Sequence, residues 1–489
     1  MPEVVLINPP PYRISEPRYD APRFTRYGLA CLAGYLLKHG HSVAIIDAKF
    51  EHLTVDETVE RALSFEPRIV GLTAFTNEII PAATVAERIK RFGPEVVTVI
   101  GGVHVSALPK ETLEEFPCFD IGVVGEGEVT FQNLCSALAQ HTRLSAIDGL
   151  VYRTRMGIVA TPPRSFVHDL DSLGPVAWDL LPAAPEYLIM LTRGCPYSCQ
   201  FCMNPNGRLV RTRSPESLFQ EIVKLLDSYA PERLWLCDEI FGSNKANAMR
   251  LLDMIIDGGI NKKTKFWCET HVRFADEPFL RKLKQANFWQ VGFGVETGDP
   301  EKLKWIKKGV DLPRILQTRQ TMREVGLDSE GFFILGQPHE TWETALRTIR
   351  LATELNLNLT AFGIMVPFPG TEIWEMAARG EGGYRLISRD WNRYGKQLGG
   401  GGLEFVHLSQ RQIKLLQIYG YVRVLLWNFR FADFVRFLWN YRREGISLLR
   451  EILFNQRTTG SDNSEAATAI SKSTYIVVSE EPLKLELIH

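Results

Sequence analysis

The chain has 489 residues, of which 45% are hydrophobic and 23% are charged, and its formal net charge at pH 7 is -1. These values are typical of a soluble globular protein with two or three domains, and the balanced charge gives no support for a nucleic-acid partner. No apolar run reaches transmembrane length, the eight cysteines are dispersed, and nothing at the N-terminus resembles a signal peptide, so the cytoplasm is the expected location.

Strand and helix patterns alternate through the first third of the chain. Short apolar runs predict strands at 4–8, 42–47, 69–73, 96–100 and 121–124. Helical patterns lie between them at 29–39, 55–63 and 82–91. This alternation predicts a doubly wound, Rossmann-like α/β domain over residues 1–145. Its ligand would bind beyond the carboxyl ends of the strands, where two glycine-rich turns lie, at 101–102 and 125–128.

The middle of the chain predicts a second α/β domain. Residues 146–186 form a predicted connector with a hairpin pattern and several prolines. From Tyr187, strand and helix patterns alternate again, which predicts a partial or full (β/α) barrel over residues 187–400. Acidic and histidine residues follow its strands, where the chemistry of such barrels is placed. They are Asp238, Glu239, Glu269, His271 and Glu296.

Three cysteines, Cys195, Cys199 and Cys202, lie in a loop after the apolar run 187–191. Gly194 and Pro196 turn the chain out of that strand. A loop of this size can direct three thiolates to one iron–sulfur cluster, and three ligands leave one iron of a four-iron cluster open. A structural zinc site is the alternative, although zinc cysteines more often form two CxxC-like pairs and the sequence offers no second pair.

The CxxxCxxC spacing, with Phe201 before the third cysteine, resembles the signature of the radical S-adenosylmethionine superfamily. The resemblance implies a [4Fe-4S] cluster on the three cysteines and S-adenosylmethionine at the open iron, cleaved by one electron to a 5′-deoxyadenosyl radical. It also implies that Phe201 contacts S-adenosylmethionine and that Asp238 or Glu239 binds its ammonium group. Glu296 would bind the ribose hydroxyls or another polar part. Helix capping is the alternative role for these acidic residues.

The first domain is similar to the cobalamin-binding domain that precedes many radical S-adenosylmethionine cores. Thr73-Ala74-Phe75 and Gly101-Gly102 loosely match the family's Ser-x-Leu and Gly-Gly positions, and the turn at 125–128 resembles a family loop that faces the corrin. The family's histidine motif after the first strand is replaced by Asn8-Pro9-Pro10, so no histidine from that loop would bind cobalt. A flavodoxin-like domain with another nucleotide, or with no ligand, is the alternative. The residues implied to contact cobalamin are Asn8, Thr73, Phe75, Gly101, Gly102, Gly125 and Glu126.

The last part of the chain follows the glycine run 399–402. It predicts a C-terminal helical region over 401–457 and a disordered tail over 458–489. Aromatic residues and arginines recur at helical spacing between 412 and 441. A helix packed on the barrel is the expectation, and an interfacial helix or a lid over a large apolar substrate is the alternative.

Together these motifs predict a cobalamin-dependent radical S-adenosylmethionine enzyme. The resemblance implies methylation of an unactivated carbon by a 5′-deoxyadenosyl radical and methylcobalamin. A radical oxidative cyclase or hydroxylase of the anaerobic porphyrin cyclase type is one alternative, and a non-catalytic cobalamin- or metal-binding sensor is another. The expected partners are a small-molecule, lipid or tetrapyrrole substrate and a one-electron reductant such as flavodoxin or ferredoxin. No nucleic acid is expected, and membrane association is not favoured.

Overall fold

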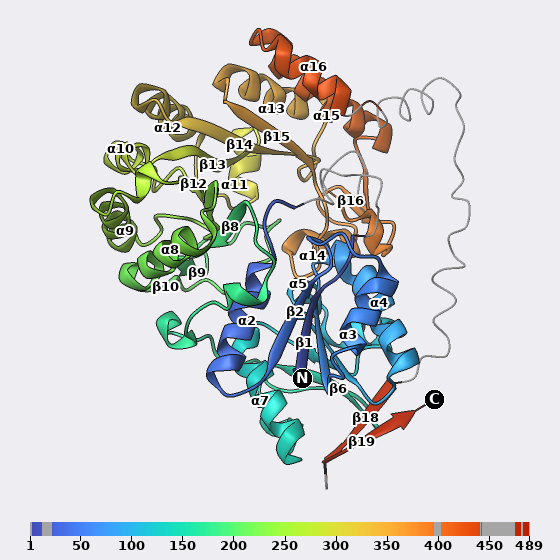
Figure 1. The fold of residues 1–489 in the computed structure, drawn as a ribbon. Helices are drawn as coiled ribbons and strands as arrows, with labels where there is room; N and C mark the ends of the chain where they lie inside the picture. Colours follow the sequence, from blue (N-terminus) through green and yellow to red (C-terminus); the bar gives the residue numbers. More distant parts are fainter. Residues whose placement is uncertain are drawn as a thin grey trace. The chain divides into compact units, whose positions relative to one another are not determined.

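The computed structural model of the chain describes residues 2–11, 22–395, 402–440, 442, 475–480 and 483–488 (Figure 1). The chain divides into a first compact unit of residues 1–197, 203–291 and 472–489, and a second unit of residues 198–202 and 292–471. Within the described ranges, no helix combines the length and the apolar character that crossing a membrane requires.

The first unit contains a seven-stranded sheet with the order β2-β1-β3-β4-β5-β6-β7. The strands from β1 to β5 pair in parallel, whereas β6 and β7 are antiparallel. Val4, Val5 and Ile7 of β1 are fully buried, as expected for a parallel strand that is covered on both faces. The strands are β1 (Val4–Asn8), β2 (Val43–Asp47), β3 (Ile69–Thr73), β4 (Val97–Gly101), β5 (Ile121–Val123), β6 (Leu150–Thr154) and β7 (Gly157–Ala160).

Helices cover both faces of this sheet. α3 packs beside α4 along one face and α2 packs beside α7 along the other (Figure 1). α3 begins at a capping box in which Thr54 and Glu57 bind each other's backbone N–H groups. The predicted doubly wound α/β fold is therefore confirmed. The helices are α2 (Tyr27–Lys38), α3 (Val55–Leu63), α4 (Ile79–Phe92), α5 (Val103–Ala107), α6 (Pro109–Glu115) and α7 (Gly127–Gln140).

The predicted connector is part of this sheet. Its hairpin is present as β6 and β7, but β6 pairs with β5, so the hairpin extends the sheet rather than linking two domains. Tyr152 and Val151 are buried there, because the antiparallel edge shares the core of the parallel strands.

A second hairpin corrects the prediction of a disordered tail. β18 (Tyr475–Glu480) and β19 (Leu483–Ile488) pair antiparallel, and β18 packs beside β6. Ile476, Val477 and Val478 are buried, and the Ile476 N–H donates to Asp120 Oδ1 at 2.7 Å. A short run of β-branched residues after a long polar stretch is enough to form a strand when an existing sheet offers it an apolar surface. The predicted tail from 458 to 474 lies outside the described residues.

The second sheet has the order β15-β14-β13-β12-β11-β8, which follows the chain. In the first unit β8 (Glu186–Ile189), β11 (Arg233–Leu236) and β12 (Lys265–Thr270) pair in parallel. β13 (Phe288–Glu296) leads into the second unit, where β14 (Asp328–Leu335) and β15 (Leu359–Ile364) pair in parallel. The predicted core with a parallel sheet is confirmed. Its helices are α8 (Pro215–Tyr229), α9 (Lys245–Asp257), α10 (Glu277–Gln285), α11 (Pro300–Trp305), α12 (Leu312–Val325), α13 (Trp342–Leu355) and α14 (Glu372–Arg379).

The last two helices described in the second unit are α15 (Gln410–Trp427) and α16 (Phe431–Asn440). α15 packs beside α13 and β15, and a Cβ added at Gly420 would lie 3.0 Å from the Phe362 ring, which explains the glycine at this contact. The expected helix packed on the core is therefore present as α15. The exposed aromatic residues of α16 differ from that expectation. Residues 396–401, which include the first three glycines of the run 399–402, and the predicted helical stretch 443–457 lie outside the described residues.

Candidate functional site

A cavity of about 210 Å³ opens at the carboxyl ends of β1, β3, β4 and β5 in the first unit. β1 lies between β2 and β3, where the strand order reverses, and open parallel sheets bind their ligands at this position. Five of the seven residues predicted to contact cobalamin line the cavity: Thr73, Gly101, Gly102, Gly125 and Glu126.

The glycines of this cavity leave its wall open. Gly102 has φ of 101°, and a Cβ there would lie 2.8 Å from the Ala74 carbonyl oxygen, so the turn after β4 requires glycine. A Cβ on Gly125 would meet no atom within 4 Å, and one on Gly101 would meet only the Leu72 carbonyl oxygen at 3.8 Å. The bare backbone of Gly101 and Gly125 can therefore approach a bulky ligand, as a cobalamin tail requires.

Asn8 and Phe75 are not among the residues that line this cavity. Asn8 Nδ2 donates to Asp47 Oδ1 at 2.5 Å, and Asn8 Oδ1 accepts from Arg26 Nε at 2.9 Å. The Phe75 ring lies 4.7 Å from the guanidinium carbon of the same Arg26. Both residues thus fix the loops after β1 and β3, and their contact with cobalamin stays a prediction.

Glu126 and Glu128 are ion-paired with arginines that flank the cysteine loop. Arg193 lies 3.2 Å from Glu126 and 2.6 Å from Glu128, and Arg211 lies 2.8 Å from Glu126. Burial opposes ionisation of Glu128, but attraction by Arg193 outweighs it, so the pKa of Glu128 is lowered. Arg193 and Asn206 also line the cavity. The glycine-rich turn and the start of the cysteine loop are therefore joined by buried charges.

Cys195 lies in the first unit, in a tightly held part of its loop. Its N–H donates to the Gly207 carbonyl at 3.0 Å, and its own carbonyl accepts from Asn204 Nδ2 at 3.1 Å. Gly194 has φ of 100°, and a Cβ there would lie 2.3 Å from the Leu209 carbonyl oxygen. Only glycine can precede Cys195 in this conformation.

Cys199 and Cys202 lie in the second unit. The Cys202 N–H donates to the Cys199 carbonyl at 3.1 Å, which closes a turn, and the Gln200 N–H donates to the Ile306 carbonyl at 3.2 Å. The Cys199 thiol points to the Lys307 carbonyl at 3.9 Å. The segment between the two cysteines is thus anchored to the backbone that follows α11.

The three loop cysteines suit an iron–sulfur cluster by their chemistry and their access to ligands. Cys195 and Cys199 are half-buried and Cys202 is exposed, whereas Cys118, Cys135 and Cys268 are buried and burial raises the pKa of each. Among the residues that the structure describes, no three His, Cys, Asp or Glu side chains are gathered closely enough to hold a metal ion. The ligation of a cluster by these cysteines stays a prediction.

Asp238 and Glu239, at the end of β11, are oriented differently. Asp238 is buried and accepts hydrogen bonds from the Leu191 N–H at 2.8 Å and from Thr192 Oγ1 at 2.7 Å. Burial raises the pKa of Asp238 to about 7. Glu239 is half-buried and accepts from the Gly194 N–H at 3.2 Å and from Asn206 Nδ2 at 2.6 Å. Glu239 is therefore the better placed of the two to receive a ligand's ammonium group.

Glu296 and Phe201 meet at Lys308 in the second unit. Glu296 ends β13 with φ of 65°, and its Oε1 lies 2.6 Å from Lys308 Nζ, with both side chains buried. The Phe201 ring centroid lies 6.0 Å from the same nitrogen. Burial opposes the charge on Lys308, but the negative charges of Glu296 and then Cys199 outweigh it and raise the pKa of Lys308. A buried cation thus lies close to two of the three loop cysteines.

Sequence reasoning did not identify Arg193, Arg211 or Lys308. Arg193 stands two residues before Cys195, and this proximity was a signal that could have singled it out. Arg211 and Lys308 belong to no motif, and only the fold brings them to their acidic partners.

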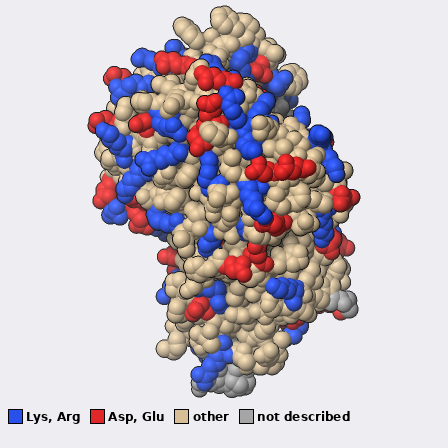
Figure 2. Space-filling view, turned by 90° about the vertical axis from the view of Figure 1, so that its left-hand side faces the viewer, with Lys and Arg blue, Asp and Glu red and all other residues tan. Residues whose placement is uncertain are grey.

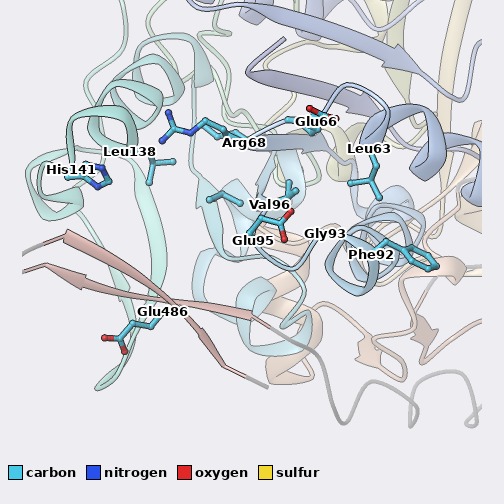
Figure 3. A pocket seen from close by; sticks show the side chains of 13 residues that line it. Leu63, Glu66, Arg68, Phe92, Gly93, Glu95, Val96, Leu138, His141 and Glu486 are labelled. Atoms are coloured by element: carbon cyan, nitrogen blue, oxygen red, sulfur yellow. The ribbon is translucent and has the colours of Figure 1, made fainter. Parts of the chain in front are cut away.

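A larger cavity of about 830 Å³ lies at the amino ends of the strands of the first sheet, opposite the smaller cavity (Figure 3). Ile69 and Val97, the first residues of β3 and β4, line it together with Glu486 of β19. Figure 3 shows the charged side chains of Glu66, Arg68 and Glu95 distributed around the opening rather than directed at one point. Ligands of parallel sheets bind at the carboxyl ends, so the smaller cavity is the candidate site.

Comparison with known proteins agrees with this architecture. Residues 21–135 match the family described as a B12 binding domain, and residues 189–369 match the radical SAM superfamily. The chain is 33% identical over 376 residues to an uncharacterized methyltransferase of Pyrococcus horikoshii, which covers 75% of this chain and 81% of that protein. It is 28% identical over 362 residues to the anaerobic magnesium-protoporphyrin IX monomethyl ester cyclase of Rubrivivax gelatinosus, which covers 71% of this chain and 65% of the cyclase.

Solved structures share the fold. The radical S-adenosylmethionine methyltransferase TsrM from Kitasatospora setae superimposes with a TM-score of 0.66 at 21% identity, covering 77% of this chain and 76% of that one.

Proposed function

The chain belongs to the family of cobalamin-dependent radical S-adenosylmethionine methyltransferases, and we propose that it transfers a methyl group to an unactivated carbon of a small-molecule substrate. The observation that carries the proposal is the glycine-walled cavity at the carboxyl edge of the first sheet. Arg193 joins this cavity to the loop that holds Cys195. This ion pair thus connects the cavity that would hold cobalamin to the loop that would hold the cluster.

The residues of the chain divide the work between binding and positioning. Cys195, Cys199 and Cys202 would hold the cluster, and the cavity residues Thr73 and Gly101 would hold cobalamin. When bound, the cluster supplies the electron that cleaves S-adenosylmethionine, and cobalamin carries the methyl group.

The acidic residues would position S-adenosylmethionine. Glu239 would accept its ammonium group in a charge-assisted hydrogen bond, because Glu239 is half-buried and open to a ligand, whereas Asp238 is buried. Glu296, held by Lys308, would direct its second oxygen at the polar part of the same ligand.

An oxidative cyclase reaction is the second candidate, because the Rubrivivax gelatinosus relative carries that name. Methyl transfer is favoured because the relative named as a methyltransferase is more similar, at 33% against 28% identity, and is covered over more of its length. A one-electron reductant of the flavodoxin or ferredoxin type would act as the partner, and the cytoplasm would be the location.

The two reactions differ in the fate of the methyl group of S-adenosylmethionine. The anaerobically reconstituted chain is incubated with S-adenosylmethionine that carries a deuterated methyl group, and the products are followed by mass spectrometry. Methyl transfer predicts labelled methylcobalamin and S-adenosylhomocysteine. Gly101→Val, which places a side chain at the cavity wall, should lose both, whereas Gly395→Val, which faces open space, should keep both. Formation of 5′-deoxyadenosine with neither product would favour the cyclase reaction instead.

A further inference from the structure

Large apolar side chains are concentrated on the surface at the end of α15 and along α16. We call six of them, together, the α15–α16 patch; each is at least half exposed. They are Trp427, Phe429, Phe431, Val435, Leu438 and Trp439. Apolar surface of this extent on a soluble unit generally marks a binding surface, because leaving it in water is unfavourable.

The helical spacing separates the patch from the anchoring face of α16. Phe431, Val435 and Leu438 follow one another at intervals of four and three residues, so they share one face of the helix. Phe437 lies on another face, where its ring centroid is 5.1 Å from that of Tyr421 in α15. α16 is therefore held to α15 by one face and presents its apolar face outward.

Arginines outnumber acidic residues beside the patch. Between residues 419 and 442 the sequence contains four arginines and one acidic residue, Asp433. Asp433 is neutralised by Arg430 at 2.7 Å and by Arg436 at 3.3 Å.

Two of the arginines cover the exposed tryptophans. Arg423 lies 5.1 Å from the Trp427 ring centroid, and Arg442 lies 4.5 Å from that of Trp439. Figure 2 shows acidic and basic side chains intermixed over most of the visible face, whereas its upper end, at the height of α16 in Figure 1, is largely tan.

We propose that the α15–α16 patch binds the surface of an anionic lipid membrane. Tryptophan, phenylalanine and leucine on one face of a helix suit the boundary between lipid headgroups and acyl chains. The guanidinium groups of Arg423 and Arg442 lie over the tryptophan rings, so positive charge accompanies the apolar face and can attract anionic lipid headgroups. No described helix is long and apolar enough to span the bilayer, so the contact is peripheral. A second copy of the chain fits less well, because a symmetric contact would bring these arginines against one another.

Vesicle flotation tests the proposal with the full chain. The protein is mixed with vesicles of phosphatidylcholine alone or of phosphatidylcholine with phosphatidylglycerol. We expect flotation with the anionic vesicles, at least tenfold weaker flotation with the neutral ones, and a decrease with added salt. The variant Trp427→Ser/Trp439→Ser should lose at least tenfold of the binding to anionic vesicles. Arg436→Gln/Arg442→Gln should bind both kinds of vesicle equally weakly.

The control variant Phe92→Ser/Trp342→Ser removes two aromatic residues that are also exposed but lie on α4 and α13. It should float like the wild type. Absence of flotation with anionic vesicles, or equal loss in the control, would overturn the proposal. A dimer in size exclusion that the Trp427→Ser/Trp439→Ser variant breaks, without vesicle binding, would assign the patch to self-association instead. Cleavage of S-adenosylmethionine by the same variants without vesicles should stay unchanged, so the outcome is independent of the proposed methyl transfer.

Discussion

The guanidinium of Arg193 lies 2.6 Å from Glu128 Oε1, so the residue two positions before Cys195 is bound to the turn that follows β5. This ion pair links residues 65 positions apart in the sequence and belongs to the first unit alone. It makes the start of the cysteine loop and the glycine-walled cavity parts of one packed structure.

Replacing Arg193 by methionine should destabilise the fold and weaken cobalamin binding together. The change removes a positive charge that lies against the buried carboxylates of Glu126 and Glu128. Removing one partner of a buried ion pair lowers the free energy of unfolding by about 3–5 kcal/mol. Urea unfolding of the apoprotein and equilibrium dialysis with cobalamin measure the two effects. Arg88→Met is the matched control, because Arg88 pairs with Asp56 on the exposed surface at 3.0 Å and should cost less than about 1 kcal/mol. Equal losses in the two variants would contradict the role given to Arg193.

Lys308→Met should lower the reduction potential of a bound cluster. Its buried ammonium lies close to Glu296, Cys199 and Cys202, and a nearby positive charge stabilises the more negative reduced state of a cluster. A redox titration followed by electron paramagnetic resonance measures the shift, at equal iron content. The neighbouring Lys307→Met removes a lysine that pairs with Glu372 on the surface and should leave the potential unchanged. An unchanged potential in Lys308→Met would exclude an electrostatic role for this residue.

Glu340 predicts a pH dependence of stability. Burial raises its pKa to about 7, above the usual value near 4.5, so the folded state binds more protons than the unfolded state between these values. The free energy of unfolding is therefore highest below about pH 4.5, where Glu340 is protonated in both the folded and the unfolded state. It decreases as the pH rises to about 7, by an amount on the order of 3 kcal/mol. Glu340→Gln keeps an oxygen for the Gly336 and Gln337 N–H groups and should remove this pH dependence. Urea unfolding between pH 5 and pH 8 measures the free energy of unfolding of the wild type and of Glu340→Gln. The same slope of this free energy against pH in both proteins would contradict the prediction.

Ile476→Ala should destabilise the first unit, although the residue lies near the end of the chain. Ile476 is buried, and its N–H donates to Asp120, whose other carboxylate oxygen lies 2.5 Å from Lys90 Nζ. Removing a large buried aliphatic side chain costs about 2–5 kcal/mol. Val406→Ala, at an exposed position, should change stability by less than about 0.5 kcal/mol. A loss of similar size in both variants, measured by urea unfolding, would show that the hairpin is not part of the cooperative fold.

The sequence was sufficient for those parts of the fold that depend on local patterns. Strands buried on both faces have continuous apolar runs, and turns that approach a ligand need glycine, so the first sheet and its cavity could be predicted from residues such as Val4 and Gly102. The predicted cofactor contacts of Asn8 and Phe75 came instead from the family resemblance. Neither the resemblance nor the local pattern revealed that Arg26 binds the Asn8 side chain and covers the Phe75 ring.

Contacts between distant segments could not be predicted from the sequence. An ion pair such as Lys308–Glu296 has no periodicity, and the buried orientation of Asp238 depends on the backbone of Leu191 and Thr192, which follow β8. The hairpin at 475–488 was missed because its short apolar run follows a polar stretch, and its stability depends on packing against β6. In each case the fold supplies the partner that decides the role of the residue.

The central claim is that the loop cysteines support radical cleavage of S-adenosylmethionine. The most direct test is the amount of 5′-deoxyadenosine that the anaerobically reconstituted chain forms from S-adenosylmethionine with a strong reductant, measured by mass spectrometry. We predict that the wild type and Cys135→Ala, at a buried position of α7, form it and that Cys199→Ala does not. Absence of 5′-deoxyadenosine together with absence of bound iron in the wild type, or equal formation by Cys199→Ala, would contradict the account.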